Sequence, residues 1–257
     1  MTQVTVENVW KVYGDQTVLE NINLEVEAGS FVALVGPSGC GKSTFLRMML
    51  GDEAPSKGRI LLDGVALDAE PSPDRGVVFQ KYSVFPHLTA LQNVMLGLEF
   101  AQSPFMGRLF GKAKKQARAE SLEMLKCVGL SNAAGKYPSE LSGGMQQRLA
   151  IAQALVKKPK ILLLDEPFGA LDPGIRAEVH EILLRLWREE GMTIFMVTHD
   201  LSEAFKLGTR VIAFDRLRTR PEEMKAYGAT VTFDLDVDGK SEPPRPEMRE
   251  ELAAAAQ

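Results

Sequence analysis

Short apolar runs alternate with longer stretches of helical periodicity along most of the chain. The runs read as buried strands and cover residues 31–35 (FVALV), 76–80 (GVVFQ), 161–165 (ILLLD) and 193–197 (TIFMV). Continuously apolar strands separated by helices are typical of a parallel sheet that is covered by helices. We therefore expect an α/β fold, with functional groups at the carboxyl ends of its strands.

Two other patterns accompany this core. The first is alternation of apolar and polar positions, which predicts an antiparallel flanking sheet. The alternating segments are residues 4–10, 21–29 and 58–64. The second is a helical pattern, which predicts an inserted helical subdomain at about 83–155 within one domain over 1–237. We expect the polar, proline-rich residues 238–257 to form a flexible tail.

Composition and charge exclude several classes of protein. The 257 residues carry a formal net charge of −4, which argues against a general nucleic-acid surface. Two cysteines make no disulfide framework and fit a reducing cytosol. The chain shows neither a signal-peptide layout nor an apolar run long enough to span a membrane, so we expect any membrane-spanning part to belong to another chain.

The sequence GPSGCGKS at residues 36–43 matches the phosphate-loop pattern, between a predicted strand and a predicted helix. Glycines let backbone amides curl around phosphate oxygens, and the start of a helix adds partial positive charge. We expect Lys42 to bridge the β and γ phosphates and the Ser43 hydroxyl to bind Mg²⁺. The alternative is a glycine-rich turn of purely structural purpose. The candidate nucleotide-binding residues here are Gly36, Pro37, Ser38, Gly39, Cys40, Gly41, Lys42, Ser43 and Thr44. Cys40 is either a small packing residue or a reactive thiol beside the helix start.

The strand ILLLD is followed by a second acid, so Asp165 and Glu166 lie together at its carboxyl end. We predict that Asp165 holds Mg²⁺ through water and that Glu166 polarises the water that attacks the γ phosphate. Paired acids also commonly end a strand in solvent, and the phosphate loop favours the functional interpretation.

Gln80 and His199 follow two other predicted strands. Each is a candidate to point at the same site: Gln80 would reach Mg²⁺ or the attacking water, and His199 would contact the γ phosphate and orient that water. For a lone glutamine or histidine, a structural role is the alternative.

The sequence LSGGMQQR places Ser142, Gly143 and Gly144 before a helical pattern, which predicts a second anion-binding helix start. Together with Gln80, ILLLDEP, GALD at 169–172 and VTHD around His199, the ordered motifs resemble those of the ATPase subunits of ABC transporters. The resemblance spans about Val4 to Phe214 and implies a phosphate-loop ATPase core that binds ATP and Mg²⁺.

In that family two ATPase domains pair head to tail. The resemblance therefore implies that Ser142, Gly143, Gly144 and Gln146 cover a nucleotide held by a second copy of the chain, while Asp172 aligns the opposite site. It also implies that Tyr13 stacks on the adenine, although Trp10 is a nearby aromatic and Tyr13 could equally be a packing residue.

The expected partners are a second ATPase subunit, membrane-spanning permease subunits and, through the permease, a periplasmic solute-binding protein. The chain resembles bacterial importers of the nitrate, sulfonate and taurine group, or related importers of urea-like compounds. It is then expected at the cytoplasmic face of the inner membrane, as a peripheral subunit. ABC ATPases of exporters, lipoprotein release, DNA repair or ribosomes are the alternatives.

Two further segments each have two possible roles at the level of sequence. Tyr82, Phe85 and Leu88 are candidates for the permease interface, with subdomain core as the alternative. Residues 100–118 are longer than the resemblance leads us to expect. This basic segment contains Phe105, Met106, Leu109 and Phe110, and it lies either near lipid headgroups or the permease, or forms a solvated amphipathic helix.

Overall fold

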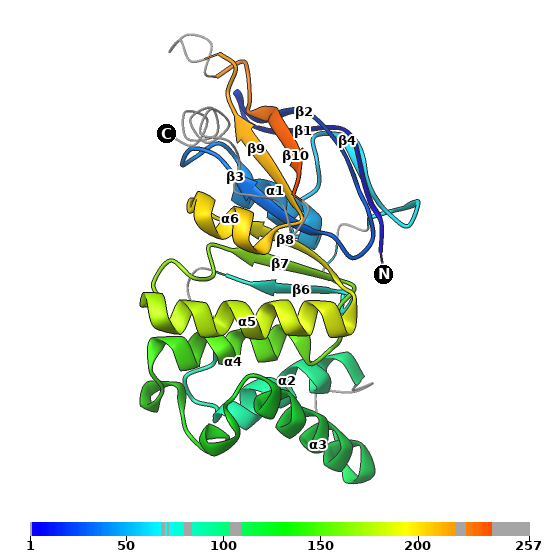
Figure 1. Ribbon diagram of the computed structural model, residues 1–257. Coiled ribbons are helices and arrows are strands. Elements are labelled where there is room, and N and C mark those ends of the chain that lie inside the picture. The colour runs from blue at the N-terminus through cyan, green and yellow to red at the C-terminus, as the bar shows by residue number, and fades with distance from the viewer. Residues whose placement is uncertain are drawn as a thin grey trace. The chain divides into compact units, whose positions relative to one another are not determined.

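The computed structural model of the chain describes residues 2–67, 70, 72–79, 84–102, 109–218 and 225–237 (Figure 1). Contacts divide the chain into two compact units: residues 1–72 with 191–257 form unit 1, and residues 73–190 form unit 2. Several positions discussed above lie outside the described residues, namely Gln80, Tyr82, Phe105, Met106 and residues 238–257.

The centre of unit 1 is the strand β3 (Phe31–Val35), which is buried along its whole length. It pairs in parallel with β8 (Thr193–Val197) on one side and β9 (Arg210–Asp215) on the other. Strand β10 (Thr230–Asp236) adds an antiparallel edge to β9. The strands predicted from the runs FVALV and TIFMV are thus confirmed, and their parallel pairing agrees with the predicted parallel sheet.

Helix α1 (Lys42–Leu50) covers this sheet through an aromatic contact. The ring of Phe45 packs edge to face on Phe195 of β8 and on Phe214 of β9, with centroid distances of 6.3 and 5.4 Å. All three rings are fully buried. The packing fixes the helix that follows the phosphate loop against two strands of the sheet. A shorter helix, α6 (Leu201–Leu207), also contacts β3.

The second sheet of unit 1 is antiparallel, with the strand order β2-β1-β4-β5. Its strands are β1 (Val4–Tyr13), β2 (Gln16–Val26), β4 (Lys57–Leu62) and β5 (Val65–Ala66). The predicted antiparallel flank is confirmed. Strand β2 alternates buried and exposed side chains along much of its length, so one face of the sheet packs inward.

Residues 225–236, which we name the clasp, connect the two sheets of unit 1. At one end the amides of Thr17 and Glu20 on β2 donate to the carbonyls of Lys225 and Ala229, at 2.9 and 2.8 Å. At the other end the clasp continues as β10 and pairs with β9. The clasp therefore joins β2 to the parallel sheet, and its strand β10 alternates half-buried and exposed side chains along much of its length.

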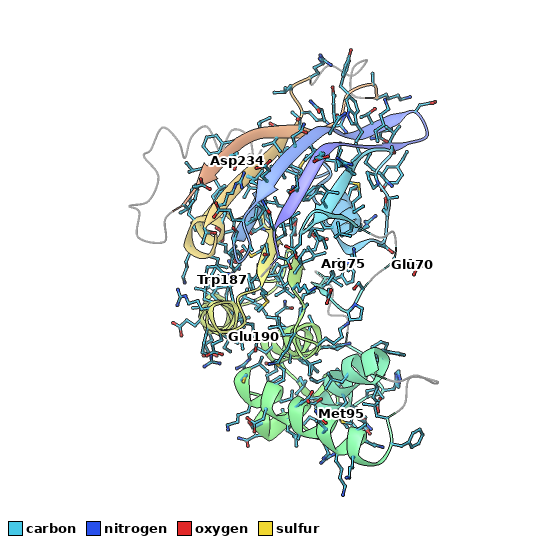
Figure 2. The ribbon with its side chains drawn as sticks, turned by 90° about the vertical axis from the view of Figure 1, so that its right-hand side faces the viewer. Glu70, Arg75, Met95, Trp187, Glu190 and Asp234 are labelled. Carbon is cyan, nitrogen blue, oxygen red and sulfur yellow. The ribbon has the colours of Figure 1, made fainter. Side chains whose placement is uncertain are left out.

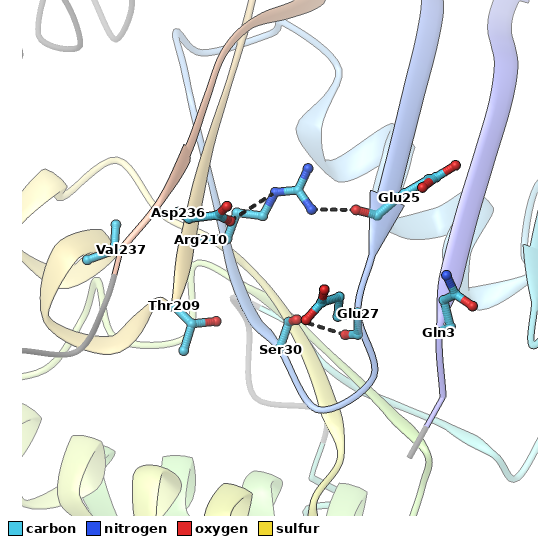
Figure 3. A pocket seen from close by; sticks show the side chains of 8 residues that line it. All are labelled: Gln3, Glu25, Glu27, Ser30, Thr209, Arg210, Asp236 and Val237. Carbon is cyan, nitrogen blue, oxygen red and sulfur yellow. Dashed lines mark hydrogen bonds and ion pairs between the residues drawn. The ribbon is translucent and has the colours of Figure 1, made fainter.

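Arg210 strengthens the clasp. Its guanidinium donates two hydrogen bonds to Asp234, both at 2.7 Å, and Asp234 lies on β10 (Figure 2). It also bonds the backbone carbonyl of Glu25 on β2 and lies 3.9 Å from Asp236 (Figure 3). The hydrogen bonds to Asp234 raise the pKa of Arg210 above its usual value, against the effect of burial. The pocket of about 480 Å³ beside this arginine is lined by none of the predicted nucleotide-binding residues.

Unit 2 contains two parallel strands, β6 (Arg75–Val78) and β7 (Ile161–Asp165). The run ILLLD is confirmed as a strand. Strand β6 begins one residue before the predicted segment and ends at Val78, two residues before Gln80. Helix α4 (Gly143–Leu155) contacts both β6 and α5 (Pro173–Glu190).

The predicted helical stretch, about 83–155, is helical over most of its described residues. It contains α2 (Ala90–Gln102), α3 (Gly111–Cys127) and the 3₁₀ turns η1 (Ser131–Ala133) and η2 (Pro138–Glu140). Helix α2 packs against α3 and α4, and Figure 2 places the buried Met95 among these helices. Among the described residues, no helix combines the length and the apolar character required to cross a bilayer.

Candidate functional site

The phosphate loop connects β3 to α1, and its glycines are required by the backbone. Gly36 has a φ of 141°, and a Cβ there would lie 2.1 Å from the carbonyl oxygen of Phe214. Gly41 has a φ of 96°, and a Cβ there would lie 2.7 Å from Leu19 Cδ2. Gly39 differs, because nothing lies within 4 Å of a Cβ built on it. Gly36 and Gly41 thus allow the loop to pack closely against its neighbours in unit 1, while Gly39 leaves room for a ligand to approach the backbone.

Lys42 is folded against the backbone of the same loop. Its Nζ donates to the carbonyls of Gly36 at 2.7 Å and Pro37 at 2.8 Å, and the residue is 7% exposed. Two carbonyls satisfy two of the three ammonium donors. The positive charge is therefore held beside the amides of the loop, as a phosphate site requires.

Cys40 has the environment of a packing residue. It is 2% exposed, and Lys42 Nζ lies 3.5 Å from its Sγ. Burial raises the pKa of the thiol, and the nearby Lys42 ammonium opposes that effect without cancelling it. Because the thiolate is the reactive form, this environment favours the packing interpretation over the reactive thiol.

Tyr13 ends β1 and is 43% exposed. Its hydroxyl donates to the carboxylate of Glu53, and Lys11 Nζ lies 4.9 Å from the ring centroid. Burial and the hydrogen bond to Glu53 raise the pKa of Tyr13, while a hydrogen bond with Thr44 acts in the opposite direction. Thr44 belongs to the first turn of α1, so the Tyr13 ring lies beside the helix that follows the phosphate loop.

Trp10, the other nearby aromatic, is held on its own sheet. Its indole Nε1 donates to Asn8 Oδ1 at 2.8 Å, and Lys57 Nζ lies 5.3 Å from its ring centroid. Unlike Tyr13, it has no described contact with α1. The structure therefore favours Tyr13 over Trp10 as the aromatic beside the phosphate loop.

His199 follows β8 by two residues and is exposed. The turn around it is fixed, because the amide of Asp200 donates to Thr198 Oγ1 at 3.1 Å and Thr198 Oγ1 donates to Glu203 at 2.8 Å. Asp200 then caps α6 by accepting from the amide of Ser202. Because β3 and β8 are parallel neighbours, His199 and the phosphate loop lie at the same edge of the unit 1 sheet.

In unit 2, Asp165 ends β7 and Glu166 follows it, both half-buried. Glu166 has a φ of 47°, in the left-handed region that is unfavourable for a residue with a Cβ. A strained backbone at an acid directly after a strand is typical of a functional position, where the surrounding structure imposes the conformation.

Helix α4 begins as the signature sequence predicts. Ser142 is its N-cap, with its Oγ accepting from the amide of Met145 at 3.4 Å. Ser142 and Gly143 are exposed. A helix provides no internal acceptor for the amides of its first turn, so those of Gly143 and Gly144 are available to an anion.

Two residues of this motif also have structural roles that the sequence did not reveal. A Cβ on Gly144 would lie 2.2 Å from Ile175 Cγ2, so this glycine allows α4 to approach α5. Gln146 donates from Nε2 to the carbonyls of Pro138 and Leu141, at 2.9 and 3.2 Å, and so holds the segment before the helix. Asp172 is exposed, and its carbonyl accepts from the amide of Arg176 at the start of α5.

A lysine-bearing phosphate loop after a parallel strand, a strand that ends in two acids and a serine-capped glycine helix together define an ATP-binding cassette. A family model described as ABC transporter matches residues 19–169. The chain belongs to the ABC transporter family, as an ATP-binding subunit that hydrolyses ATP.

Individual relatives agree with this assignment. The bicarbonate transport ATP-binding protein CmpD of Synechocystis sp. is 44% identical over 213 residues, which cover 81% of this chain and 73% of CmpD. The aliphatic sulfonates import ATP-binding protein SsuB of Yersinia pestis bv. Antiqua is 43% identical over 217 residues, which cover 84% of this chain and 74% of SsuB.

A solved structure with a similar fold is that of MJ0796, described as a dimeric bacterial ABC transporter cassette. It aligns with a TM-score of 0.74 at 34% identity, covering 92% of this chain and 99% of MJ0796. A second MJ0796 structure is described as a dimeric post-hydrolysis state bound to ADP and Pi, with a TM-score of 0.73. The predicted P-loop NTPase fold is confirmed.

Proposed function

We propose that this chain is the ATP-hydrolysing motor of an importer and that it works as a pair of identical subunits. The phosphate loop of one copy holds ATP, and the helix start at Ser142 of the other copy covers the γ phosphate. Closure of the pair on ATP and its release after hydrolysis drive partner subunits in the membrane.

The observation that carries this proposal is the presence of two different anion-binding helix starts in one chain. One has the buried Lys42 held against its loop, and the other has an exposed serine cap and an exposed glycine. Each helix start suits phosphate oxygens, and each is formed without a contribution from the other. MJ0796 is described as a dimeric cassette, and this supports the pairing of two copies of the chain.

The proposed chemistry divides among the residues as follows. Lys42 and the loop amides bind the β and γ phosphates, and Tyr13 stacks on the adenine. Glu166 accepts a proton from the water that attacks the γ phosphorus, while His199 orients that water and contacts the γ phosphate. ADP is the leaving group. In the second copy, Gln146 and Asp172 support the covering helix and the alignment of the site.

The residues proposed for Mg²⁺ fit this ion. The Ser43 hydroxyl, the Asp165 carboxylate and the Gln80 amide oxygen are hard oxygen donors, which Mg²⁺ prefers. When bound, the ion would neutralise charge on the β and γ phosphates. Asp165 would hold it through water.

The proposed solute belongs to the nitrate, sulfonate and taurine group or is a urea-like compound, and the similarity to SsuB, an aliphatic sulfonates import protein, supports the sulfonate member of this group. The solute would be selected by a periplasmic binding protein and passed to a permease. The chain would then lie at the cytoplasmic face of the inner membrane, without contact with nucleic acid.

A pocket of about 500 Å³ in unit 2 is the proposed contact for the permease. The polar side chains on its wall include Lys114 and Arg118 of α3, and its apolar lining includes Met95 and the partly exposed Leu122. Phe85, 39% exposed, precedes the lining residue Leu88 in the chain. The lining also includes Glu99 of α2, so the pocket combines apolar side chains with two cations and one acid, which suits an amphipathic helix that places its apolar face in the pocket. Leu109, in contrast, is buried and is therefore no membrane anchor, whereas Phe110 is 77% exposed.

Replacing Glu166 with Gln tests the motor mechanism. The variant should bind ATP, form stable dimers in its presence and lose about 10²-fold or more in hydrolysis rate, because the attacking water lacks its base. Dimerisation is measured by light scattering with and without ATP. Turnover at the wild-type rate would show that Glu166 is not the base, and a chain that stays monomeric with ATP would contradict the pairing.

Replacing Leu122 with Glu tests the permease contact. The variant should lose co-purification with a polytopic membrane protein from the cells of origin and keep its own ATP binding. Leu217→Glu is the matched control, because Leu217 is an exposed leucine of unit 1. The unmodified chain should co-purify with a permease and a solute-binding protein. If it co-purifies with ribosomal or DNA-repair proteins in their place, the importer assignment is wrong, while the assignment as an ATPase still holds.

A further inference from the structure

Glu53 lies just beyond the end of α1, in a turn that is anchored to the helix. Gly51 caps α1 with a φ of 86°, and the amides of Asp52 and Glu53 donate to the carbonyl of Arg47 at 3.0 and 3.4 Å. The position of the Glu53 backbone is thus set by the helix that begins at the phosphate loop.

The Glu53 carboxylate collects three donors from two elements. The Tyr13 hydroxyl and Lys11 Nζ, at 2.9 Å, come from β1, and Arg47 Nη1, at 3.1 Å, comes from α1. The Glu53 side chain is 19% exposed. Because one carboxylate joins the end of β1 to the end of α1, the Tyr13 ring is linked to the helix that carries the phosphate loop.

The same network gives the two faces of the Tyr13 ring different surroundings. Lys11 Nζ lies 4.9 Å from the ring centroid, and it is held there by Glu53 and by the carbonyl of Ala54 at 2.9 Å. A cation over one ring face is attracted by the π electrons and occupies that face. A nucleotide base therefore has only the opposite face of Tyr13 to stack on.

We propose that Glu53 is a positioning residue for the nucleotide base. It holds the Tyr13 hydroxyl, and it keeps Lys11 on one ring face, so that the other face is presented at a fixed position relative to the phosphate loop. This inference rests on the proposed function, in which Tyr13 stacks on adenine. It adds a residue outside the recognised motifs and predicts that this residue acts on the base and not on the phosphates.

The charge of the network persists over the working range of an ATPase. Burial alone raises the pKa of Glu53, but the hydrogen bonds from Tyr13, Lys11 and Arg47 outweigh it and lower that pKa to about 2. Glu53 is therefore ionised at every pH at which ATP binding is measured. Its network adds no pH dependence to ATP binding near neutrality.

The experiment compares the dissociation constants of ATP and of inorganic tripolyphosphate by calorimetry on the full chain. Glu53→Ala should weaken ATP binding about three- to tenfold and leave tripolyphosphate binding unchanged, because only ATP carries a base. Tyr13→Phe keeps the ring and removes the hydroxyl, so it should have a similar effect. The double variant should lose less than the product of the two single effects, because both changes break the same link.

Two further variants make the outcomes distinguishable. Glu7→Ala removes another ion-paired carboxylate of β1, bonded to Arg59 at 2.6 Å, and should leave both constants unchanged. Tyr13→Ala removes the stacking ring. If Tyr13→Ala binds ATP as the wild type does, the proposed adenine site is wrong. If Tyr13→Ala weakens ATP binding and Glu53→Ala does not, only the role of Glu53 is overturned. The role of Glu53 is also overturned if Glu53→Ala weakens the binding of ATP and of tripolyphosphate equally.

Discussion

Gly144 shows how one residue of a binding motif also serves the packing of the protein. Its motif suggests a glycine that lets phosphate approach, yet a Cβ at this position meets Ile175 Cγ2 at 2.2 Å. A β-carbon so close to a branched side chain must push α4 away from α5. The glycine is therefore required within the unit, whether or not a nucleotide is bound.

Gly144→Ala should destabilise the chain by about 1–3 kcal/mol, the usual cost of overpacking a close helix contact. Trimming the partner in the double variant Gly144→Ala with Ile175→Ala should recover part of that loss. Thermal unfolding measures both. Gly135→Ala is the control, since nothing lies within 4 Å of a Cβ there. An equal penalty with and without Ile175 would show that the contact is not the cause.

At this scale the sequence predicts residues that belong to a local motif and misses those that act through space. Lys42 and Ser142 were identified because their neighbours in the chain define a pattern. Glu53 is 40 residues from Tyr13 and lies in an ordinary polar turn, so no local pattern marks it. Two cations, Lys11 and Arg47, need a carboxylate partner, and that was the signal available in the sequence. It does not identify Glu53, because the three residues become neighbours only when β1 packs beside α1.

At the scale of elements, Asn93 ties α2 to the segment before it. The side chain is fully buried, its Oδ1 accepts from the amide of Phe85 at 2.7 Å, and its Nδ2 donates toward the carbonyls of Phe85, Leu88 and Thr89 at 3.0–3.1 Å. One amide thus fixes residues 85–89, the segment that leads into the proposed permease pocket.

Asn93→Asp should lower the melting temperature by about 5–10 °C near neutral pH, because a carboxylate replaces the donor that faces three carbonyl oxygens. Those oxygens disfavour the ionised form and raise the pKa of the new carboxyl in the folded state. The loss of stability should then shrink as the pH falls from about 7.5 to about 5.5, since protonation is favoured in the folded chain. Melting curves over that range measure it.

The neighbouring Gln92 provides the control for this pH dependence. Its Oε1 accepts from the amide of Thr89 at 2.8 Å, so Gln92→Glu keeps the acceptor and adds the same charge at an exposed site. This variant should be nearly neutral across the same range. If the loss of stability in Asn93→Asp does not change with pH, the three carbonyl oxygens do not raise the pKa of the new carboxyl, and this explanation is wrong.

The elements themselves follow closely from the apolar pattern. Strands β3, β7 and β8 have the predicted bounds because each is a continuous buried run between polar residues. Strand β6 is shorter than its apolar run because Phe79 is 40% exposed and lies beyond the ladder. Alternation alone could not assign β10 a partner, because antiparallel pairing with β9 depends on contacts that no local pattern specifies.

At the scale of the whole molecule, the clasp joins the two sheets of unit 1 and lies beside the phosphate loop. Ala229 pairs with the Val18–Leu19 segment of β2, and the same segment limits the space at Gly41. A Cβ on Gly228 would lie 2.8 Å from the backbone of Leu19. The fit of the clasp therefore depends on a glycine outside every nucleotide motif.

Gly228→Ala should loosen the clasp and lower the stability of the chain by about 1–3 kcal/mol. The amides of Thr17 and Glu20, which donate to the clasp, should then exchange hydrogen faster than in the wild type. Hydrogen exchange with mass spectrometry measures this locally. Gly174→Ala, on an open turn of α5, serves as the comparison and should be neutral or slightly stabilising. Unchanged exchange at both amides would rule out a supporting role for the clasp.

The discontinuous make-up of unit 1 also bears on how the protein is made. Unit 2 is one continuous stretch, residues 73–190, whereas unit 1 needs residues 1–72 together with 191–257. On the ribosome, β3 emerges before β8 and β9, so it gains its two parallel neighbours only after β9 has been synthesised. The phosphate loop is therefore translated before the strands that complete its sheet, and the nascent chain acquires its ability to bind nucleotide only once β9 has emerged.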